Sequence, residues 1–258
     1  MANQKNVKKA DQYNDKNHNY LRYWDNRKYE NQAEVIAINK LLSGKHFKLA
    51  VDLGGGYGRL STVLAEYSDK VVLSEPSSQQ LDIAKEYLKD FPSIERKIMQ
   101  ADNLEFPTGS VDLLAMVRVM HHLPDPSVEL AEISRVLSKD GYAIIEVANY
   151  AHFLNRIRLF VKGKKLPTTP VDIRSKEHRN QNEIPFVNHN PRTVIWQFDQ
   201  AGLIVERVLS VSNLRHQIFK SILPMPALLF LEKVLQQPLS GTYFGPSIFF
   251  LLRKKIIY

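Results

Sequence analysis

Cysteine is absent from the 258-residue sequence, and so are long uninterrupted apolar runs. Without cysteine, the chain has no disulfide, no thiolate nucleophile and no cysteine-based zinc site. The longest apolar run, residues 222–231, is interrupted by Pro224 and Pro226. It is far shorter than the ~18 residues that suggest a membrane span. Residues 1–9 lack the apolar core of a secretory signal. We therefore expect a cytoplasmic protein without a transmembrane segment.

Positive charge is scarce in the middle of the chain, although the formal net charge of the whole is +8. Residues 1–50 carry ten Lys/Arg and five Asp/Glu, residues 51–150 carry nine and sixteen, and residues 151–258 carry sixteen and six. This distribution suggests that the two ends face a different partner from the middle. An anionic substrate, a membrane surface or RNA would each fit, and a simply solvated surface is favoured over nucleic acid.

Glycine is also sparse, with eleven residues, yet four of them lie within five positions: Gly54, Gly55, Gly56 and Gly58. A short apolar run, residues 48–53, precedes them, and residues 60–67 have the pattern of a helix. Strand, glycine turn and helix form the first unit of an α/β nucleotide-binding fold. Glycines can adopt a positive φ in a tight turn and let a ligand lie against the backbone.

The spacing of these glycines does not fit a dinucleotide. The pattern Gly-x-Gly-x-x-Gly would need a third glycine where Arg59 stands. Asp52, two residues before Gly54, would repel a pyrophosphate and suits a ligand with a positive charge nearby. A nicotinamide oxidoreductase is therefore the last of the alternatives, and a glycine-rich turn without any ligand stays open.

Two further acids stand at the ends of predicted strands. Glu75 ends an apolar run that begins at residue 71, and Asp102 follows a strand predicted over residues 94–100. An open parallel sheet binds ligands beyond the carboxyl ends of its strands, where the acid of the second strand accepts ribose hydroxyls. We therefore expect Asp52, Glu75 and Asp102 to line one crevice, although a surface role for Glu75 is the alternative.

Two motifs carry a resemblance to a known family. The segment Asp52-Leu-Gly-Gly-Gly-Tyr-Gly58 resembles the first motif, acidic-x-Gly-x-Gly-x-Gly, of the class I S-adenosylmethionine-dependent methyltransferases. An apolar strand over 111–117, the pair His121-His122, Leu-Pro-Asp-Pro and a helix over 128–137 resemble the fourth motif of ubiquinone/menaquinone-type C-methyltransferases, the methyltransferase type 11 domain. The motifs cover about residues 33–150, and residues 190–258 match by strand pattern only.

The resemblance implies an α/β fold. A Rossmann-like seven-stranded sheet, mostly parallel with an antiparallel last strand, would carry helices on both faces and insertions on the substrate side. We expect an N-terminal lid segment over residues 1–28 and a single methyltransferase domain over residues 29–258. The insertions would span about residues 151–187 and 212–244.

The resemblance also implies S-adenosylmethionine as the cofactor, S-adenosylhomocysteine as its product, and no metal. The residues that it assigns to cofactor binding are Asp52, Gly54, Gly55, Gly56, Gly58, Glu75, Pro76, Asp102, Asn103, Leu104, Val117, Tyr23 and Arg27. Asp102 would meet the adenine amino group, and the backbone of Asn103 would donate to the ring. Tyr20, Tyr23 and Arg27 are candidate lid residues, with Arg27 placed to meet the cofactor carboxylate. The alternative is that these aromatic residues only pack the first helix on the sheet.

His121 and His122 are the candidate catalytic residues. Adjacent residues point in different directions, so at most one should face the site, where a neutral imidazole could accept a proton from the methyl acceptor. The alternative is that either histidine packs against or caps the following helix. Two adjacent histidines do not easily share one tetrahedral metal ion.

The function that these features predict is methyl transfer to a small-molecule acceptor, anionic or lipophilic, by in-line displacement at the sulfonium, in a monomer or homodimer. An RNA methyltransferase that uses the basic termini is one alternative. The absence of an Asn/Asp-Pro-Pro-aromatic motif counts against methylation of base amines. A catalytically inactive cofactor-binding module is the other alternative.

Overall fold

The computed structural model of the protein describes Tyr13 and residues 20–180 and 183–255. Its nine strands are β1 Phe47–Leu53, β2 Ser68–Ser74, β3 Ile94–Lys97, β4 Val111–Met116, β5 Leu137–Ala148, β6 Val171–Asp172, β7 Val187–Asn188, β8 Leu203–Val211 and β9 Ser247–Lys254. Its described helices are α1 Tyr20–Tyr23, α2 Lys28–Leu42, α3 Ser61–Leu64, α4 Ser78–Tyr87, η2 Met120–His122, α5 Ser127–Val136, α6 Phe153–Val161, α7 Lys176–Asn180, α8 Pro191–Gln200, α9 Gln217–Ile222, α10 Met225–Leu235 and η3 Ser240–Thr242.

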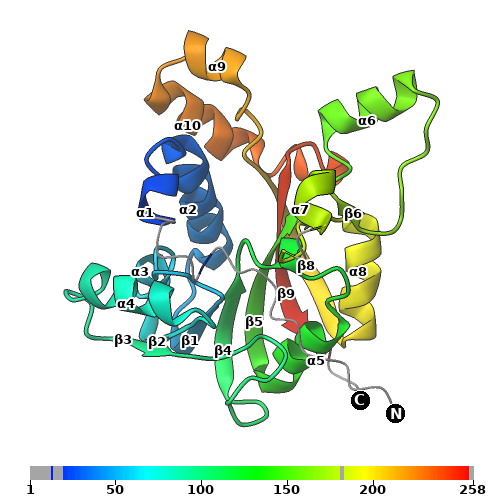
Figure 1. Cartoon of the computed structure of the whole chain (residues 1–258). Coiled ribbons are helices and arrows are strands. Elements are labelled where there is room, and N and C mark those ends of the chain that lie inside the picture. Colours follow the sequence, from blue (N-terminus) through cyan, green and yellow to red (C-terminus); the bar gives the residue numbers. More distant parts are fainter. Residues whose placement is uncertain (1–12, 14–19, 181–182, 256–258) are drawn as a thin grey trace.

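Seven strands form one sheet in the order β3-β2-β1-β4-β5-β9-β8 (Figure 1). The first five run parallel to one another, whereas β9 is antiparallel to both β5 and β8. The predicted fold class is therefore confirmed, including the antiparallel last strand. The strand order reverses direction between β1 and β4, which is where open α/β sheets bind their ligands.

Helices cover both faces of the sheet. Alternate side chains of a strand point to opposite faces, and they belong to two different apolar clusters. On β9, Phe249 and Leu251 pack with residues of α2, α3 and α4, whereas Ile248 and Phe250 pack with residues of α5 and α8. This is why the central strands read as near-continuous apolar runs in the sequence. The two layers of helices hold the sheet edge in a fixed position.

Two helices begin at residues whose side chains cap them. The Ser77 hydroxyl accepts a hydrogen bond from the backbone N–H of Gln80 at the start of α4. The Asn190 side chain accepts one from the N–H of Arg192, with Pro191 in the first turn of α8. Each cap satisfies a backbone donor that the helix itself leaves unpaired.

Some boundaries differ from the prediction. The helix expected over residues 60–67 is limited to α3, because the carbonyl of Tyr67 already accepts from the N–H of Phe47 and the chain enters β2 at Ser68. The strand expected over residues 94–100 ends at Lys97. Strand β5 contains an irregularity, where the partners of β4 shift from Leu137 to Tyr142.

The segments predicted as insertions carry structure of their own. Residues 151–187 contain α6, α7 and the first strand of the small β6-β7 hairpin, and residues 212–244 contain α9, α10 and η3. Of the predicted lid segment, only Tyr13 and residues 20–28 are described, and the side chain of Tyr20 lies outside the description. The domain division thus stays a prediction.

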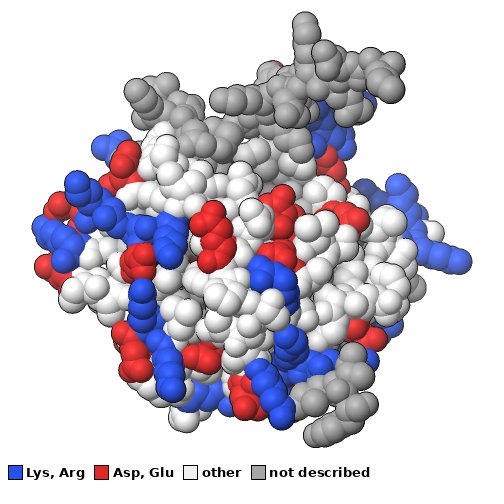
Figure 2. Space-filling model, turned by 90° about the horizontal axis from the view of Figure 1, so that it is seen from below, with Lys and Arg blue, Asp and Glu red and all other residues white. Residues whose placement is uncertain are grey.

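The molecule seen from below carries acidic and basic side chains side by side (Figure 2).

In the part of the chain that the structure describes, no helix is long and apolar enough to cross a bilayer.

Candidate functional site

A cavity of about 300 Å³ lies beyond the carboxyl ends of β1, β2, β3 and β4. Each of these strands delivers its following loop to the cavity wall. Its lining residues include Tyr13, Trp24, Asp52, Gly54, Gly55, Gly56, Arg59, Glu75, Pro76, Ser77, Asp102, Val117, Arg118, Val119, His122, Leu123, Glu129 and Ile184. The crevice that the sequence predicted is therefore formed, and the three predicted acids all line it.

The glycine turn after β1 makes one wall of this cavity. Gly54 and Gly56 have φ angles of 67° and 60°, which a side chain would strain. A Cβ at Gly54 would also collide with the side chain of Val119. The N–H of Gly54 donates to the carbonyl of Ser74 at 2.7 Å, so the turn is held against the end of β2. The cavity thus has a bare backbone as its wall.

Asp52 lies at the bottom of the cavity and is almost fully buried. Burial raises the pKa of its carboxyl to about 6, against the opposing effect of a hydrogen bond from the Ser61 hydroxyl at 2.7 Å. Near neutral pH the carboxylate is therefore close to its own titration. A cation placed in the cavity would favour the ionised form.

Glu75 is fixed by two backbone donors. Its carboxylate accepts from the N–H of Gly56 at 2.9 Å and from the N–H of Ser77 at 3.0 Å. These contacts join the glycine turn after β1 to the start of α4 and orient the carboxylate at the cavity wall. Charge-assisted bonds of this type are stronger than those between neutral groups.

The segment after β3 contributes one of its three predicted residues. Asp102 is exposed and lines the cavity. Asn103 is not among the lining residues, and its backbone N–H donates to the carbonyl of Gln100 at 3.3 Å. Leu104 is buried in the apolar cluster on the α5 face, where its N–H donates to Glu132. The structure therefore places Asp102 alone of the three at the cavity.

Of the remaining predicted cofactor residues, Pro76 and Val117 line the cavity, and three do not. A Cβ at Gly58 would meet the side chains of Leu88 and Leu73, so this glycine allows close packing of the turn. Tyr23 and Arg27 contact each other, with the guanidinium 4.2 Å from the ring centroid. The residue of this segment that does reach the cavity is Trp24.

The two histidine rings lie beside each other, with their centroids 4.1 Å apart, but only one of them lines the cavity. His122 lines the cavity, whereas His121 is buried against the ring of Phe186. Burial lowers the pKa of His121 well below its ordinary value, with a further contribution from His122. His122 Nδ1 lies 2.9 Å from the carbonyl of Pro185, which can only accept, so Nδ1 carries the proton. Nε2 then accepts from the hydroxyl of Tyr13 at 2.9 Å.

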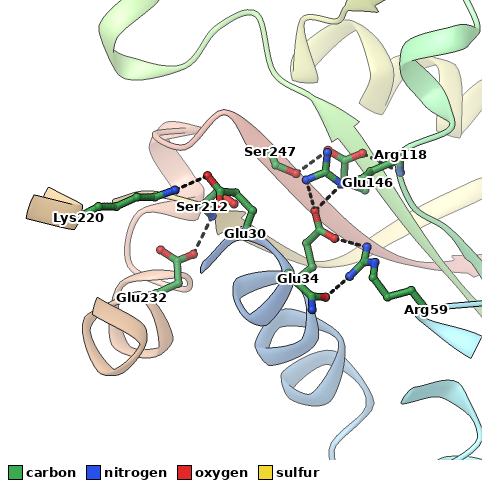
Figure 3. A network of polar contacts seen from close by, with 10 residues as sticks. Glu30, Glu34, Arg59, Arg118, Glu146, Ser212, Lys220, Glu232 and Ser247 are labelled. Carbon is green, nitrogen blue, oxygen red and sulfur yellow. Dashed lines mark hydrogen bonds and ion pairs between the residues drawn. The ribbon is translucent and has the colours of Figure 1, made fainter. Parts of the chain in front are cut away.

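A buried ion cluster adjoins the cavity (Figure 3). Glu34 of α2 pairs with Arg59, which follows the glycine turn, and with Arg118, which follows β4. Both guanidinium groups also lie over the ring of Trp24, at 3.7 and 4.7 Å from its centroid. The backbone N–H of Arg118, a residue with φ of 61°, donates to Glu146 of β5.

This cluster sets the ionisation of its members. Burial alone would raise the pKa of the Glu34 carboxyl, but the two guanidinium groups outweigh it and hold that pKa below its ordinary value. Burial raises the pKa of Glu146, against the opposing charge of Arg118. Arg59, Arg118 and Trp24 of this cluster all line the cavity.

Sequence reasoning did not find this cluster or Glu129. Glu34 and Arg118 are 84 positions apart, and no sequence motif connects them. Glu129 stands in the first turn of α5, and one of its carboxylate oxygens is buried without a hydrogen-bond partner among the described residues. Burial raises the pKa of Glu129. The only sequence signal for Glu129 is its place just after the Leu-Pro-Asp-Pro segment.

Metal ligands do not gather in the described part of the chain. Within residues 20–180 and 183–255 and at Tyr13, no three His, Cys, Asp or Glu side chains are grouped so as to hold a metal ion. The cavity instead combines bare backbone, carboxylates and aromatic rings, which suits an organic ligand with both polar and apolar parts.

Comparison with known proteins agrees with this arrangement. Residues 51–145 match the family model described as methyltransferase domain. The UbiE ubiquinone/menaquinone biosynthesis C-methyltransferase of Pseudoalteromonas translucida is 26% identical over 145 residues, which are 53% of this chain and 57% of that protein. The enzyme of the same name from Campylobacter jejuni (strain RM1221) is 30% identical over 115 residues, 42% of this chain and 47% of that protein. The chain spans about a third to a half of the length of most curated relatives it matches.

Solved structures share the fold over almost the whole chain. A SAM-dependent methyltransferase of Thermotoga maritima has a TM-score of 0.61 at 20% identity and covers 92% of this chain and 94% of its own. The [4+2]-cyclase SpnF has a TM-score of 0.57 at 14% identity and covers 88% of this chain and 82% of its own. At such identities the likeness shows the fold alone, and a cyclase among the neighbours illustrates that one fold hosts different reactions.

Proposed function

We propose that this protein transfers a methyl group from S-adenosylmethionine to a small-molecule acceptor. The premise is that residues 51–145 match a methyltransferase domain and that the chain has the fold of class I S-adenosylmethionine-dependent methyltransferases. The observation that supports this proposal best is the convergence of three carboxylates and a bare glycine turn on one cavity at the strand ends. That wall suits a nucleoside with a positively charged sulfur and no phosphate.

Each acid has a distinct task in this proposal. Glu75, oriented by two backbone N–H groups, accepts hydrogen bonds from the ribose hydroxyls. Asp102 accepts from the adenine amino group. Asp52, at the bottom of the cavity, provides a negative charge near the positively charged end of the cofactor. Arg59 and Arg118, presented beside Trp24, are candidates to meet the cofactor carboxylate in place of Arg27.

The reaction needs little chemistry from the protein. When bound, the cofactor supplies an activated methyl group on a sulfonium leaving group. The chain contributes alignment of the acceptor with that methyl, and good orientation can remove on the order of 7–11 kcal/mol of barrier. The rigid loops after β1, β2 and β4 provide this alignment because each is hydrogen-bonded to a neighbouring strand or loop.

His122 is the proposed proton acceptor, and Tyr13 is its partner. The ring is held by Pro185 through Nδ1, which leaves Nε2 as the basic nitrogen. Tyr13 donates to Nε2, and its carbonyl accepts from the Ser77 hydroxyl at 2.9 Å. An acceptor would deliver its proton to Nε2 directly or through the Tyr13 hydroxyl. Such general-base assistance contributes about 10²–10⁴-fold. His121, buried away from the cavity, has no proposed catalytic role.

The acceptor is proposed to be small and partly lipophilic. The cavity lining includes three apolar side chains, Val119, Leu123 and Ile184, together with His122 and Glu129. Ile184 belongs to the insertion over residues 151–187, which is how that insertion shapes the acceptor site.

The direct test is titration calorimetry with S-adenosylmethionine and with S-adenosylhomocysteine. We expect micromolar binding that Glu75→Gln and Asp102→Asn each weaken by about tenfold, because each removes a charge-assisted hydrogen bond. Glu105→Gln is the matched control, since this exposed acid lies outside the cavity. Absence of binding heat with both ligands would overturn the proposal.

Turnover distinguishes an enzyme from an inactive binding module. Formation of S-adenosylhomocysteine in the presence of candidate lipophilic acceptors is the readout. His122→Gln is expected to lower kcat by at least about a hundredfold while the cofactor Kd changes little. If His122→Gln leaves the pH profile of kcat unchanged, the histidine is not the base.

A further inference from the structure

Helix α6 has its apolar side on the outside. Five of its six large apolar residues fall within about 120° of a helical projection, and the sixth, Leu159, lies on the opposite side. The five are Phe153, Leu154, Ile157, Phe160 and Val161. All five side chains are exposed, and Phe160 is 85% and Val161 78% accessible to solvent. An amphipathic helix of a globular protein normally turns this stripe toward the core.

The opposite side of α6 is the one attached to the protein. Asn155 is buried and donates to the carbonyl of Tyr150. At the base of the helix, the ring of Phe153 stacks on Phe244, and the N–H of Phe153 donates to the carbonyl of Phe244. These contacts anchor the base of α6, while Leu154, Ile157, Phe160 and Val161 of the stripe stay exposed to solvent.

Helix α9 repeats this arrangement. Ile218, Phe219 and Ile222 are 58%, 41% and 71% exposed. On the other side of the same helix, Lys220 pairs with Glu30 of α2 at 2.7 Å. Figure 1 shows that α6 and α9 both project at the end of the molecule where the parallel strands finish, which is also the end that holds the cavity.

The charge around α6 indicates which kind of partner this surface can bind. The exposed side chains of residues 153–165 include five cations, Arg156, Arg158, Lys162, Lys164 and Lys165, and the segment contains no acid. By contrast, the end seen in Figure 2 mixes both signs. A second copy of the chain, packed about a two-fold axis on this helix, would bring five cations against five cations. An anionic surface complements them.

We propose that α6, assisted by α9, docks the protein onto membranes that contain anionic lipids. The phenylalanine and aliphatic side chains enter the boundary between headgroups and acyl chains, and the flanking cations contact lipid phosphates. Since the cavity lies at the same end, docking would turn its surroundings toward the lipid. This inference does not depend on methyl transfer, because it concerns a surface outside the cavity.

The test is co-sedimentation of the full-length protein with vesicles of phosphatidylcholine containing about 30% phosphatidylserine, compared with pure phosphatidylcholine. Binding is expected to the anionic vesicles and to weaken with salt. The triple variant Lys162→Gln, Lys164→Gln, Lys165→Gln should reduce partitioning by about a hundredfold, which is roughly fivefold for each cation. Phe160→Ser should reduce it by about tenfold or more.

Trp196→Ser is the matched control, because Trp196 is an exposed aromatic residue, 61% accessible, on α8. It should bind vesicles as the parent protein does. Absence of binding to anionic vesicles, or binding that the α6 variants leave unchanged, overturns the proposal. A dimer in light scattering that Phe160→Ser dissociates would assign the face to self-association instead. Binding to an acidic protein without binding to vesicles would equally reject the membrane.

Discussion

Asp52 shows how one side chain is tuned by its place in the fold. In water its carboxyl would be ionised at pH 7, but burial raises its pKa to about 6. Because the folded-state pKa lies above the ordinary value of 3.8, the stability that this group contributes is present below about pH 4 and is lost as the pH rises through about 6. A cation bound beside Asp52 would offset the free-energy cost of burying its ionised carboxylate.

This predicts a pH dependence of cofactor binding. If binding requires ionised Asp52, the apparent Kd for S-adenosylmethionine should fall about tenfold between pH 5 and pH 7, with proton release near pH 6. Calorimetry in buffers of different ionisation enthalpy measures both quantities. Asp52→Asn should bind more weakly at pH 7 and should show a flatter profile. An equally steep profile in that variant would assign the titration to another group.

Two glycines allow the cost of backbone strain to be measured separately from the cost of a steric clash. Gly54 and Gly109 both have a positive φ, of 67° and 72°, but only Gly54 has a neighbour in the way of a Cβ. Gly109→Ala should therefore cost about 1–2 kcal/mol of unfolding free energy from conformation alone. Gly54→Ala should cost about 1–3 kcal/mol more, because Val119 must move. Urea denaturation compares the two, and equal losses would contradict the packing argument.

At the scale of elements, α2 acts as the support of the cavity. Its Glu34 connects the loop after β1 to the loop after β4, and its Tyr29 donates to Glu232 of α10 at 2.7 Å. The Glu232 carboxylate also accepts from the backbone N–H groups of Ser212 and Asn213. One helix thereby fixes both the cavity wall and the base of the α9–α10 insertion (Figure 3).

Glu34→Gln should destabilise the protein by about 3–5 kcal/mol, because it leaves two partly buried guanidinium groups without their counter-charge. The measurement is urea unfolding at pH 7. Since the pKa of Glu34 is depressed in the folded state, its contribution is present above the ordinary pKa of 4.5 and lost as the pH falls further. Glu86→Gln, in an exposed pair with Lys89, is the control and should change stability by less than about 1 kcal/mol.

At the scale of the whole molecule, the cavity joins four strands and the supporting helix, so that a ligand there should stabilise the fold as a unit. S-adenosylhomocysteine at a hundred times its Kd would add about 2.7 kcal/mol. For a chain of this size, that corresponds to a rise in Tm of roughly 5–10 °C. A thermal shift measurement tests this, with NAD at the same concentration as the control. A comparable rise with NAD would favour the dinucleotide alternative that the glycine spacing argues against.

The architecture was accessible from local patterns. Apolar runs of strand length and the glycine turn are properties of consecutive residues, and they predicted the parallel strands of the sheet. Helix and strand ends were less predictable. The end of α3 is set by a hydrogen bond from another segment of the chain, which the N–H of Phe47 donates to the carbonyl of Tyr67.

The sequence by itself determined that Asp52, Glu75 and Asp102 would meet at one edge, because parallel strands bring their carboxyl ends together whatever the side chains do. Only the tertiary structure decided which neighbours complete the cavity. Trp24 is placed there by two guanidinium groups from other elements, and His122 rather than His121 faces inward. Such contacts depend on side-chain direction and on distances between segments far apart in the chain, which no local pattern contains.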